Sequence, residues 1–496
     1  MKRILPFLLA FVMLLIIIVS VSAQSIPEAT NPDPGDGSVD VTVMSLSSSA
    51  AISVTFQYVD QDGNVDATIQ KTVQALSSQG FDAADSGLPD NWVGSAIVSA
   101  GDEIAAIAQI KWQNGSSTDG KTAGAYDAFN TGANTLYFPS LASRDNQQFS
   151  ELFIQSMSSA SSVDTIDVYI TFYDRDGNES LASPVVRTIK GGANTTLNLL
   201  TDVTLPVTDP PGDGWLGSAV VTSTAPIAGV TTMHWLQFSS AYSAVADGNT
   251  KLYFPSGTRR LPSGPWEQYT SLEVQNLDPS QAAEVEVSWY DRDNNQLFVF
   301  TDTIQAYASH GYNTRYVSSN VPDHAALHAA LGADWNGSMV VESTNGVDIV
   351  GIVKLQWTPD HPAGAGASAY YSLDTGYPEL FVPAVYRRND GTWLQFTGLI
   401  VQNVGTTACN NFTVQWRNPA GTTLLSFQDS LNPSIAHGYN TRYQADTPGS
   451  VNLGDLGTAL RNGTVYINAP GCSLNAIDNT VWPEWTDSTT YNVYGR

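Results

Sequence analysis

Apolar and polar residues alternate along several short stretches of the chain, in the same phase each time. In residues 52–58, ISVTFQY, every second residue is apolar. Residues 166–172, 285–289 and 412–416 repeat this alternation. A period of two is typical of a β-strand with one buried face, and a slip by one residue would turn the apolar set toward water. The pattern therefore predicts a chain built mainly of β-strands.

A turn rich in Asp, Gly and Asn follows these stretches, and the turns mark an internal repeat. FYDRDGN at residues 172–178 returns as WYDRDNN at 289–295 and, in a blurred form, within QYVDQDGN at 57–64. Aligning the turns on Gly63, Gly177, Asn294 and Gly421 gives steps of 114, 117 and 127 residues. Two further landmarks keep similar spacing: a WxGS motif that begins at Trp92, Trp215 and Trp335 and becomes RNGT at Arg461, and a YFP-like segment at residues 136–140, 252–256 and 380–384.

Four tandem units explain this repetition. About seven strand-like runs fit into each unit, and the unit length suits a two-sheet antiparallel sandwich. A propeller blade is much shorter, at about 40 to 50 residues. One segment, PDHAALHAALGADW at residues 322–335, is predicted to contain a short helix. We place the β-sandwich units at residues 40–140, 141–256, 257–384 and 385–496.

The YFP-like segment ends one unit and adjoins the next. The junctions between units should therefore be short and semi-rigid. Tandem units joined in this way predict an elongated particle.

The first 23 residues have the features of a secretory signal peptide. Lys2 and Arg3 precede an apolar run over residues 4–19, and small residues lead up to Ala23. This arrangement predicts cleavage after Ala23, with residues 24–39 as a flexible leader. The alternative is an uncleaved anchor, because the apolar run approaches the length of about 20 residues that spans a bilayer. No second membrane span is predicted.

Charge and composition limit the partners. Of the 496 residues 42% are apolar, which is enough to form cores, and 14% are charged, which is well below the usual fraction of about 25%. Such a surface of uncharged polar residues is common outside the cell. Cleavage after Ala23 removes two of the 21 basic residues and none of the 47 acidic ones, so the net charge moves from −26 to −28. Nucleic acid and anionic membrane are excluded as partners, because both bind neutralising cations.

Cys409 and Cys472 are the two cysteines of the chain. An isolated pair in an exported protein is more often bridged than free, so a disulfide is predicted. The bridge would close a loop of 63 residue steps, for which loop-closure entropy gives about 4 kcal/mol of stabilisation.

Pairs of acidic residues in the turns are candidate calcium ligands. They are Asp60, Asp62, Asp174, Asp176, Asp291 and Asp293. An EF-hand loop needs Gly at its sixth position and Glu at its twelfth. Counted from Asp174, Gly177 is fourth and Val185 is twelfth, so the EF-hand fails. A tight hairpin explains the same residues, and the fourth unit keeps the turn as RNPAG without either acid. We favour the turn, and calcium bound at unit junctions is the alternative.

Candidate catalytic groups are few. His324 and His328 have the i, i+4 spacing of a helical metal pair, but Ala325 stands where a zinc protease has its glutamate base. The chain contains no GxSxG elbow, phosphate loop or dinucleotide fingerprint. The seven-residue sequence HGYNTRY occurs twice, at residues 310–316 and 437–443. Their His and Arg are separated by an odd number of residues, so on a strand they lie on opposite faces and do not form one pocket.

Repeated residues are expected to serve the shared fold. The WxGS tryptophans are therefore assigned to the core, with a row of sugar-binding tryptophans as the alternative. Arg144, Arg260 and Arg388 each follow the proline of a YFP-like segment by five residues. We interpret them as residues that cap the linker or pair with carboxylates at the unit junction.

The turns, the WxGS motif and the strand rhythm resemble the immunoglobulin-like sandwich modules that occur in tandem in bacterial surface and secreted proteins. This resemblance implies scaffolding, adhesion or ligand display rather than catalysis. We therefore predict a secreted or cell-surface structural or adhesive protein without enzymatic activity or cofactor, whose partner is a cell-surface protein or a glycan. The first alternative is an array of carbohydrate-binding modules accessory to a polysaccharide-degrading system. The second is an enzyme with its site at a unit junction.

Overall fold

The computed structural model describes most of the chain. The described residues are 10–14, 35–90, 92–114, 122–144, 148–159, 164–208, 214–235, 238–261, 265–317, 320–358, 366–443, 448, 451–457, 459–483 and 487–496. Of the predicted signal peptide, only Ala10–Leu14 is among them, as strand β1. The rest of that segment and most of the leader lie outside the described residues.

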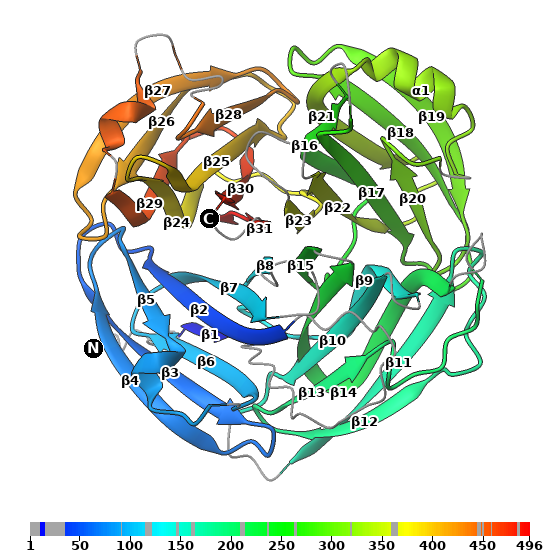
Figure 1. Cartoon of the computed structure of the whole chain (residues 1–496), viewed down its shortest axis with the longest axis horizontal. Coiled ribbons are helices and arrows are strands. Elements are labelled where there is room, and N and C mark those ends of the chain that lie inside the picture. Colours follow the sequence, from blue (N-terminus) through cyan, green and yellow to red (C-terminus); the bar gives the residue numbers. More distant parts are fainter. Residues whose placement is uncertain are drawn as a thin grey trace, which may run out of the picture.

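The chain is nearly all-β, and its strands pair antiparallel, as the alternation predicts. The second unit shows the arrangement that recurs (Figure 1). Its strands are β9 (Ala133–Arg144), β10 (Gln148–Ser156), β11 (Thr165–Asp174), β12 (Val185–Lys190), β13 (Asn194–Asn198), β14 (Gly214–Trp235) and β15 (Phe238–Ser243). The first half of β14 pairs with β9 and β11, and its second half pairs with β10 and β15. The two groups of strands enclose one apolar core.

The other three units repeat this arrangement with separate strands in place of the long β14. The first has β2 (Gly35–Ser45), β3 (Ile52–Asp60), β4 (Val65–Val73), β5 (Ser78–Asp82), the 3-10 helix η1 (Ala83–Ser86), β6 (Gly94–Ala100), β7 (Ile104–Asn114) and β8 (Thr122–Asp127). Its sheets have the orders β1-β6-β3-β4 and β5-β2-β7-β8. Alternate residues of β3 are buried, which confirms the predicted phase of this strand.

The third and fourth units follow the same order. The third contains β16 (Lys251–Arg260), β17 (Gln268–Asn276), β18 (Ala283–Asp291), β19 (Gln296–Ile304), β20 (Ser309–Asn313), α1 (His324–Leu331), β21 (Asp334–Ser343), β22 (Ile349–Trp357) and β23 (Gly366–Tyr371). The fourth contains β24 (Glu379–Asn389), β25 (Trp393–Asn403), β26 (Cys409–Arg417), β27 (Thr423–Leu431), β28 (Ala436–Asn440), η3 (Leu453–Leu456), β29 (Ala459–Asn468), β30 (Leu474–Trp482), β31 (Asp487–Asn492) and β32 (Tyr494–Gly495). By strand pairing, each YFP-like segment opens the unit that follows it, because β9 pairs with β14 and β16 pairs with β21.

The short helix forms where the sequence predicts it. α1 spans His324–Leu331, and the side chain of Asp323 caps it by accepting a hydrogen bond from the N–H of Ala326. Leu327 and Leu331 turn into the core of the third unit. No helix in the described part of the chain is long and apolar enough to cross a membrane.

The four units close into a ring, so the expectation of an elongated particle is wrong. Figure 1 shows them around a common centre, where one strand from each unit meets the others. These central strands are β8, β15, β23 and β31, and each contacts the central strands of its two neighbours. The first residue of β31, Asp487, is 1% exposed. These strands were not predicted as a repeated element from the sequence.

One carboxylate joins the central strands. Asp487 accepts hydrogen bonds from the backbone N–H of Ala123 on β8 (2.6 Å), of Ala367 on β23 (2.7 Å) and of its neighbour Ser488 (2.8 Å). The backbone of Ser239 on β15 supplies a further hydrogen bond. Burial raises the pKa of Asp487 well above its usual range, and the N–H donors act in the opposite direction by stabilising the ionised form. This side chain therefore touches all four units.

Replacing Asp487 by Asn should weaken the ring. The amide would present an NH₂ group to backbone N–H donors, and at least one buried donor would lose its acceptor. We expect the free energy of unfolding to fall by about 1–3 kcal/mol in a denaturant titration. Asp176→Asn, at an exposed turn position, is the matched control and should change it by less than about 0.5 kcal/mol. Equal effects of the two substitutions would contradict this role for Asp487.

Candidate functional site

The acidic turns are held by their own side chains. Asp174 accepts hydrogen bonds at Oδ1 from the N–H of Asp176 (3.0 Å) and of Asn178 (2.9 Å). Asp60 and Asp291 bind the equivalent N–H groups of their turns. In the fourth unit Asn418 makes the same two contacts, at 3.1 Å and 2.9 Å. The first acid of each pair is therefore a turn-forming residue, a role that an amide oxygen fills equally well.

The turns also connect the units. A Cβ atom at Gly63, Gly177 or Gly421 would lie 2.9, 3.0 or 2.9 Å from the carbonyl oxygen of Gly191, Ala306 or Ala75, respectively. In the third unit Asn294 donates from Nδ2 to the carbonyl of Pro433 (3.5 Å). Each turn therefore packs against a loop of the next unit, and the fourth unit packs against the first. Such close approach explains the small residue in three of the four turns.

In the WxGS motif the tryptophan belongs to the core of its unit and the hydroxyl residue lies at the junction with the next unit. Trp92, Trp215 and Trp335 are buried, as the core assignment predicts, and do not form an exposed sugar-binding row. The hydroxyl group of the first, second and fourth copies contacts the next unit instead. Ser95 donates to the carbonyl of Gly192 (2.7 Å), Ser218 to that of Tyr307 (2.7 Å) and Thr464 to that of Leu76 (2.9 Å).

A buried ion cluster lies between the second and third units. Arg175, from the second acidic turn, reaches Glu273 at 2.5 Å, and Lys354 lies 3.2 Å from the same carboxylate. Burial alone would raise the pKa of Glu273, but the two cations lower it to about 2. The pKa of Lys354 is lowered, chiefly by burial. The cluster is a structural ion group, because its charges face one another, Glu273 and Lys354 are largely buried and the Arg175 side chain is only 26% exposed.

The histidines and acidic side chains of the described residues are the candidate metal ligands. No group of three or more His, Cys, Asp or Glu side chains in the described part of the chain is placed to hold a metal ion. The rings of His324 and His328 lie 4.4 Å apart, and His324 contacts the carbonyl of Asn313 at 2.9 Å. Burial is the main cause that lowers the pKa of His328.

In each HGYNTRY segment the histidine and the first tyrosine contact the same aspartate. His310 and Tyr312 both contact Asp302, at 2.7 and 2.9 Å. In the fourth unit His437 and Tyr439 contact Asp429 at 2.8 and 2.7 Å. The arginine of each segment faces elsewhere, so His and Arg do not share a pocket, as predicted.

Each of these arginines joins a cluster of aromatic rings, which we call a platform. The third-unit platform consists of Trp266, Tyr269, Arg315 and Tyr316, and the fourth-unit platform of Trp393, Phe396, Arg442 and Tyr443. In both platforms the guanidinium carbon lies 5.6 Å from the Trp ring and 4.8 Å from the last Tyr ring. Tyr316 is 52% exposed and Tyr443 53%. Two units therefore present the same aromatic and cationic group to solvent.

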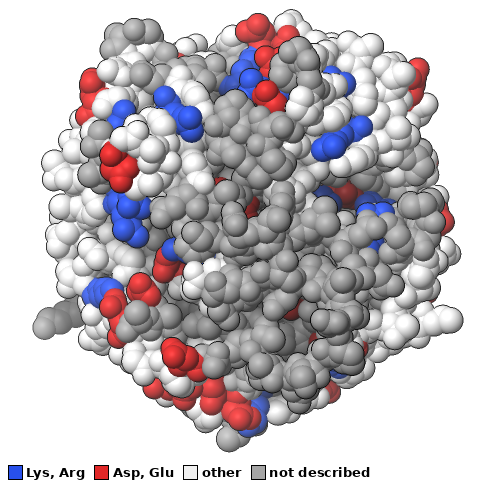
Figure 2. Space-filling view, viewed as in Figure 1, with Lys and Arg blue, Asp and Glu red and all other residues white. Residues whose placement is uncertain are grey.

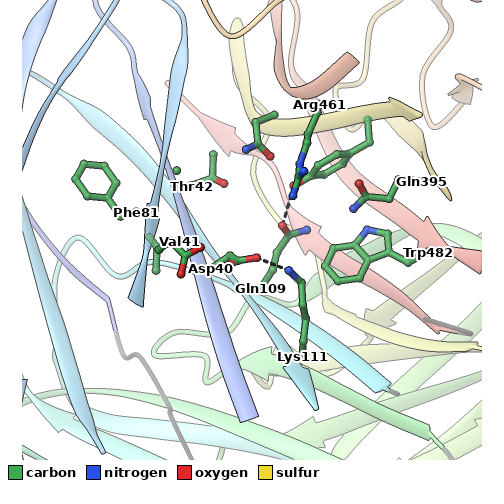
Figure 3. A pocket seen from close by; sticks show the side chains of 13 residues that line it. Asp40, Val41, Thr42, Phe81, Gln109, Lys111, Gln395, Arg461 and Trp482 are labelled. Carbon is green, nitrogen blue, oxygen red and sulfur yellow. Dashed lines mark hydrogen bonds and ion pairs between the residues drawn. The ribbon is translucent and has the colours of Figure 1, made fainter. Parts of the chain in front are cut away.

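A polar pocket of about 150 Å³ lies between the first and fourth units (Figure 3). Lys111 pairs with Asp40 at its wall and lies 5.0 Å from the ring of Trp482. Tyr386 donates to Oε1 of Gln109 across the junction (2.8 Å). Nε2 of Gln109 has no hydrogen-bond partner in the described structure. The pocket has room for a small polar ligand. The aromatic side chains that line it, Phe81, Tyr386 and Trp482, are buried.

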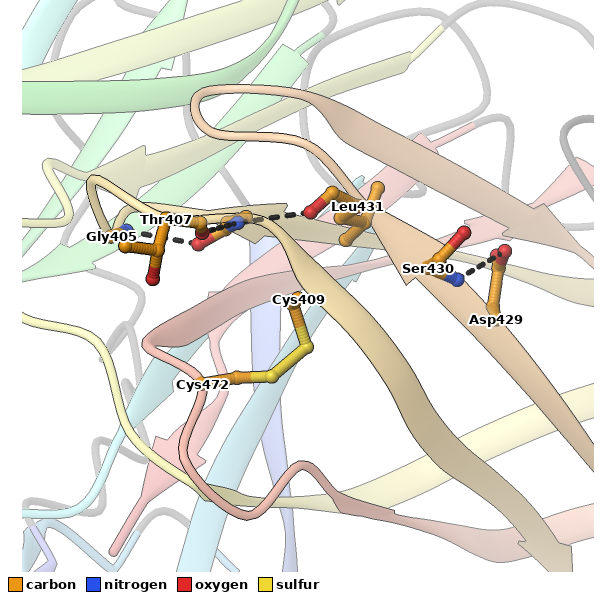
Figure 4. Close-up of a disulfide and its surroundings, with 8 residues drawn as sticks. Gly405, Thr407, Cys409, Asp429, Ser430, Leu431 and Cys472 are labelled. Atoms are coloured by element: carbon orange, nitrogen blue, oxygen red, sulfur yellow. Dashed lines mark hydrogen bonds between the residues drawn. A yellow bond between two sulfur atoms is a disulfide. The ribbon is translucent and has the colours of Figure 1, made fainter.

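The remaining predicted residues have local roles. Arg260 pairs with Asp334 at 2.9 Å, as a carboxylate-pairing residue, although the pair lies within one unit. Arg388 donates to Gln395 of its own unit. The predicted disulfide is present between Cys409 at the start of β26 and Cys472 in the turn before β30, with 5.3 Å between the Cα atoms (Figure 4).

Sequence reasoning missed the platforms and the ion cluster. The arginine of HGYNTRY was noted, but two of its three aromatic partners lie far away in the sequence, in or just before β17 and in β25. Glu273 carries no local motif. A comparison of Trp266 with Trp393, each of which precedes the arginine of its HGYNTRY segment by 49 residues, was the one signal available.

Comparisons with known proteins leave the chain without a family. No family model matches it, and no curated protein matches it. A structure of allantoicase aligns at 8% identity with a TM-score of 0.15, over 79% of this chain and 77% of that one. A trypsin-activated alpha-2-macroglobulin from Escherichia coli aligns at 10% identity with a TM-score of 0.11, over 95% of this chain and 40% of that one. These likenesses are too weak to bear on function.

The ion cluster predicts a loss of stability in acid. Because the pKa of Glu273 is about 2 in the folded protein and about 4.5 in the unfolded chain, its contribution is present above pH 4.5 and is lost as the pH falls toward 2. Glu273→Gln should lower the free energy of unfolding at pH 7 by about 3 kcal/mol and flatten its dependence on pH in this window. Glu342→Gln, at an exposed pair with Lys251, is the control and should have little effect. An unchanged pH profile in Glu273→Gln would contradict the assignment.

Proposed function

We propose that this protein is a non-catalytic secreted or cell-surface protein with a structural or adhesive role, made of four immunoglobulin-like modules behind a cleaved signal peptide. The observation that carries the proposal is the use of the repeated polar motifs in building the ring. The acidic turns and the WxGS hydroxyls contact neighbouring units. Residues that serve the framework in several copies are not catalytic groups in a single site.

Two properties support a place outside the cytoplasm. The Cys409–Cys472 bridge is of a kind that forms and persists in oxidising compartments. On the described part of the face shown in Figure 2, acidic and basic side chains are scattered among uncharged residues. This surface fits the low charged fraction of the sequence, 14%.

The platforms are the surfaces that we assign to partner contact. A half-exposed tyrosine and an adjacent guanidinium offer an apolar face and several hydrogen-bond donors at one place. The first and second units have QGFDAAD and GGANTTL where the platforms have HGYNTRY, so the shared fold does not require this group. Binding of a glycan at the two platforms, as an array of carbohydrate-binding modules, is the second candidate function, and these exposed aromatic rings are the observation that favours it.

An exported preparation of the full chain tests the proposal. We expect the protein outside the cytoplasm to begin at Gln24, to contain no free thiol and to bind isolated cell envelopes. The double variant Tyr316→Ala and Tyr443→Ala should lose most of this binding while its melting temperature changes by only a few degrees. Arg187→Ala, which removes a charge on β12 of the second unit, outside both platforms, is the control.

The outcomes separate the two candidate functions. Binding to proteinaceous envelope fractions without a signal on a glycan array favours an adhesive role, and a glycan signal that the double variant loses favours the carbohydrate-binding role. A chain that retains Met1 in the cytoplasm with two free thiols would contradict export.

A further inference from the structure

The first unit differs from the others at one edge of its sheet. In the second, third and fourth units, the strand that carries the WxGS motif lies between two partners, one of which is the YFP-like strand: β9, β16 or β24. The corresponding strand of the first unit is β6. Its partner on that side is β1, Ala10–Leu14, which belongs to the predicted signal peptide.

The backbone register shows that β1 stands in for a YFP-like strand. Val12 is paired with Val98 and Leu14 with Ala96. The equivalent pairs in the other units are Leu136 with Val221 and Phe138 with Ala219, Leu252 with Val341 and Phe254 with Met339, and Leu380 with Ile467 and Val382 with Val465. The same place in each sheet is therefore filled by a strand in the same register.

A buried tyrosine gives an independent sign of an incomplete edge. In three units the tyrosine of the central strand binds the backbone just beyond the YFP-like core positions. Tyr242 donates to the carbonyl of Ser140 (2.7 Å), Tyr370 to that of Ser256 (2.6 Å) and Tyr491 to that of Ala384 (2.7 Å). Each hydroxyl also accepts from the N–H of the same residue.

Tyr126 is the equivalent residue of the first unit. It pairs with Ala108 of β7 as Tyr242 pairs with Thr231 of β14. The side chain is 1% exposed, yet its hydroxyl has no hydrogen-bond partner among the described residues. A buried hydroxyl without a partner is costly, and native proteins normally satisfy such groups. The missing partner is the backbone segment that the other three units supply.

We propose that, once the signal peptide is removed, the β6 edge of the first unit accepts an extended segment of another protein. The inference rests on the cleavage after Ala23 that the proposed function includes. The segment would add a strand antiparallel to β6, with two apolar residues spaced i, i+2 over the core positions and a backbone peptide group two residues later for Tyr126. Main-chain hydrogen bonds provide affinity in this mode of recognition, and the alternate pockets provide specificity.

The structure favours a different protein over a second copy as the donor. The YFP-like strands of a second copy are already paired within their own units. The part of its leader that precedes β2, residues 24–34, has three prolines and no apolar alternation, a composition that disfavours strand pairing. The net charge of −28 that remains after cleavage favours a neutral or basic segment.

The segment should also be short. In the other units a hydroxyl accepts the N–H of a residue beyond the tyrosine contact: Ser150 from Ala142, Thr270 from Thr258 and Thr397 from Tyr386. By register with β7, the first unit has Val39 at this place. Because Val39 offers no acceptor, the edge is built for the part of the strand up to the tyrosine contact, about seven residues.

A peptide titration tests the edge directly. The protein is prepared as the full chain with a protease site engineered within residues 15–34, cut after folding and freed of the N-terminal piece. The probe is the peptide KLYFPSG, the sequence of residues 251–257, and the control peptide has its Leu and Phe replaced by Asp. We expect saturable binding of the probe by fluorescence polarisation, at least tenfold tighter than the control, and a rise in melting temperature.

Two substitutions distinguish specific strand addition at β6 from non-specific binding of the peptide. Tyr126→Phe should weaken probe binding about fivefold and leave the stability of the empty protein unchanged or slightly higher, since it removes an unpartnered hydroxyl. Tyr242→Phe, whose hydroxyl is paired within its own unit, should lower stability and leave probe affinity unchanged. Equal binding of probe and control peptides would overturn this inference without touching the proposed function. An exported protein that retains Met1 would overturn the proposed cleavage and, with it, the free edge.

Discussion

The ring depends on a small, buried centre in which four strands from different units lie against one another. Such close packing requires small side chains, and a Cβ atom at Gly124 would lie 2.9 Å from the backbone nitrogen of Ala241. It also leaves backbone N–H groups buried away from water, where each needs an acceptor. The carboxylate of Asp487 supplies that acceptor to several strands at once. Placing an acidic group there is costly in desolvation, and the convergent N–H donors offset that cost.

The contacts between the turns of one unit and the loops of the next also close the ring. Each unit extends its acidic or amide-containing turn toward the following unit, and the fourth unit reaches the first through Gly421 and Thr464. A motif repeated in tandem can therefore serve two purposes, since the same turn closes a hairpin within one unit and fixes the angle to the next. The platforms and the β6 edge are the places where the units differ, and differences between repeats are where a particular function is expected.

Local features could be predicted from the sequence, and long-range ones could not. Alternation identified β3 and β11, the turn chemistry identified the role of Asp174, and the helix and disulfide form where their residues indicated. The ring was missed because nothing in a linear repeat tells whether rigid junctions extend or close. The central strands were missed because they are short and rich in small residues, as in TAGAYD, and so lack a clear apolar alternation. Their recurring tyrosine, at Tyr126, Tyr242, Tyr370 and Tyr491, was the signal that could have revealed them.

The candidate site was predicted only in outline. HGYNTRY was recognised as unusual. The platform that its arginine forms also needs Trp266 or Trp393, which the fold brings next to the arginine. Small-angle scattering of the chain that begins at Gln24 tests the central claim, which is that the four units close into a ring. A closed particle of this length should have a radius of gyration of about 23 Å. A rod-like profile with a radius of gyration above about 35 Å, as expected for four units in a row, would contradict the closed ring.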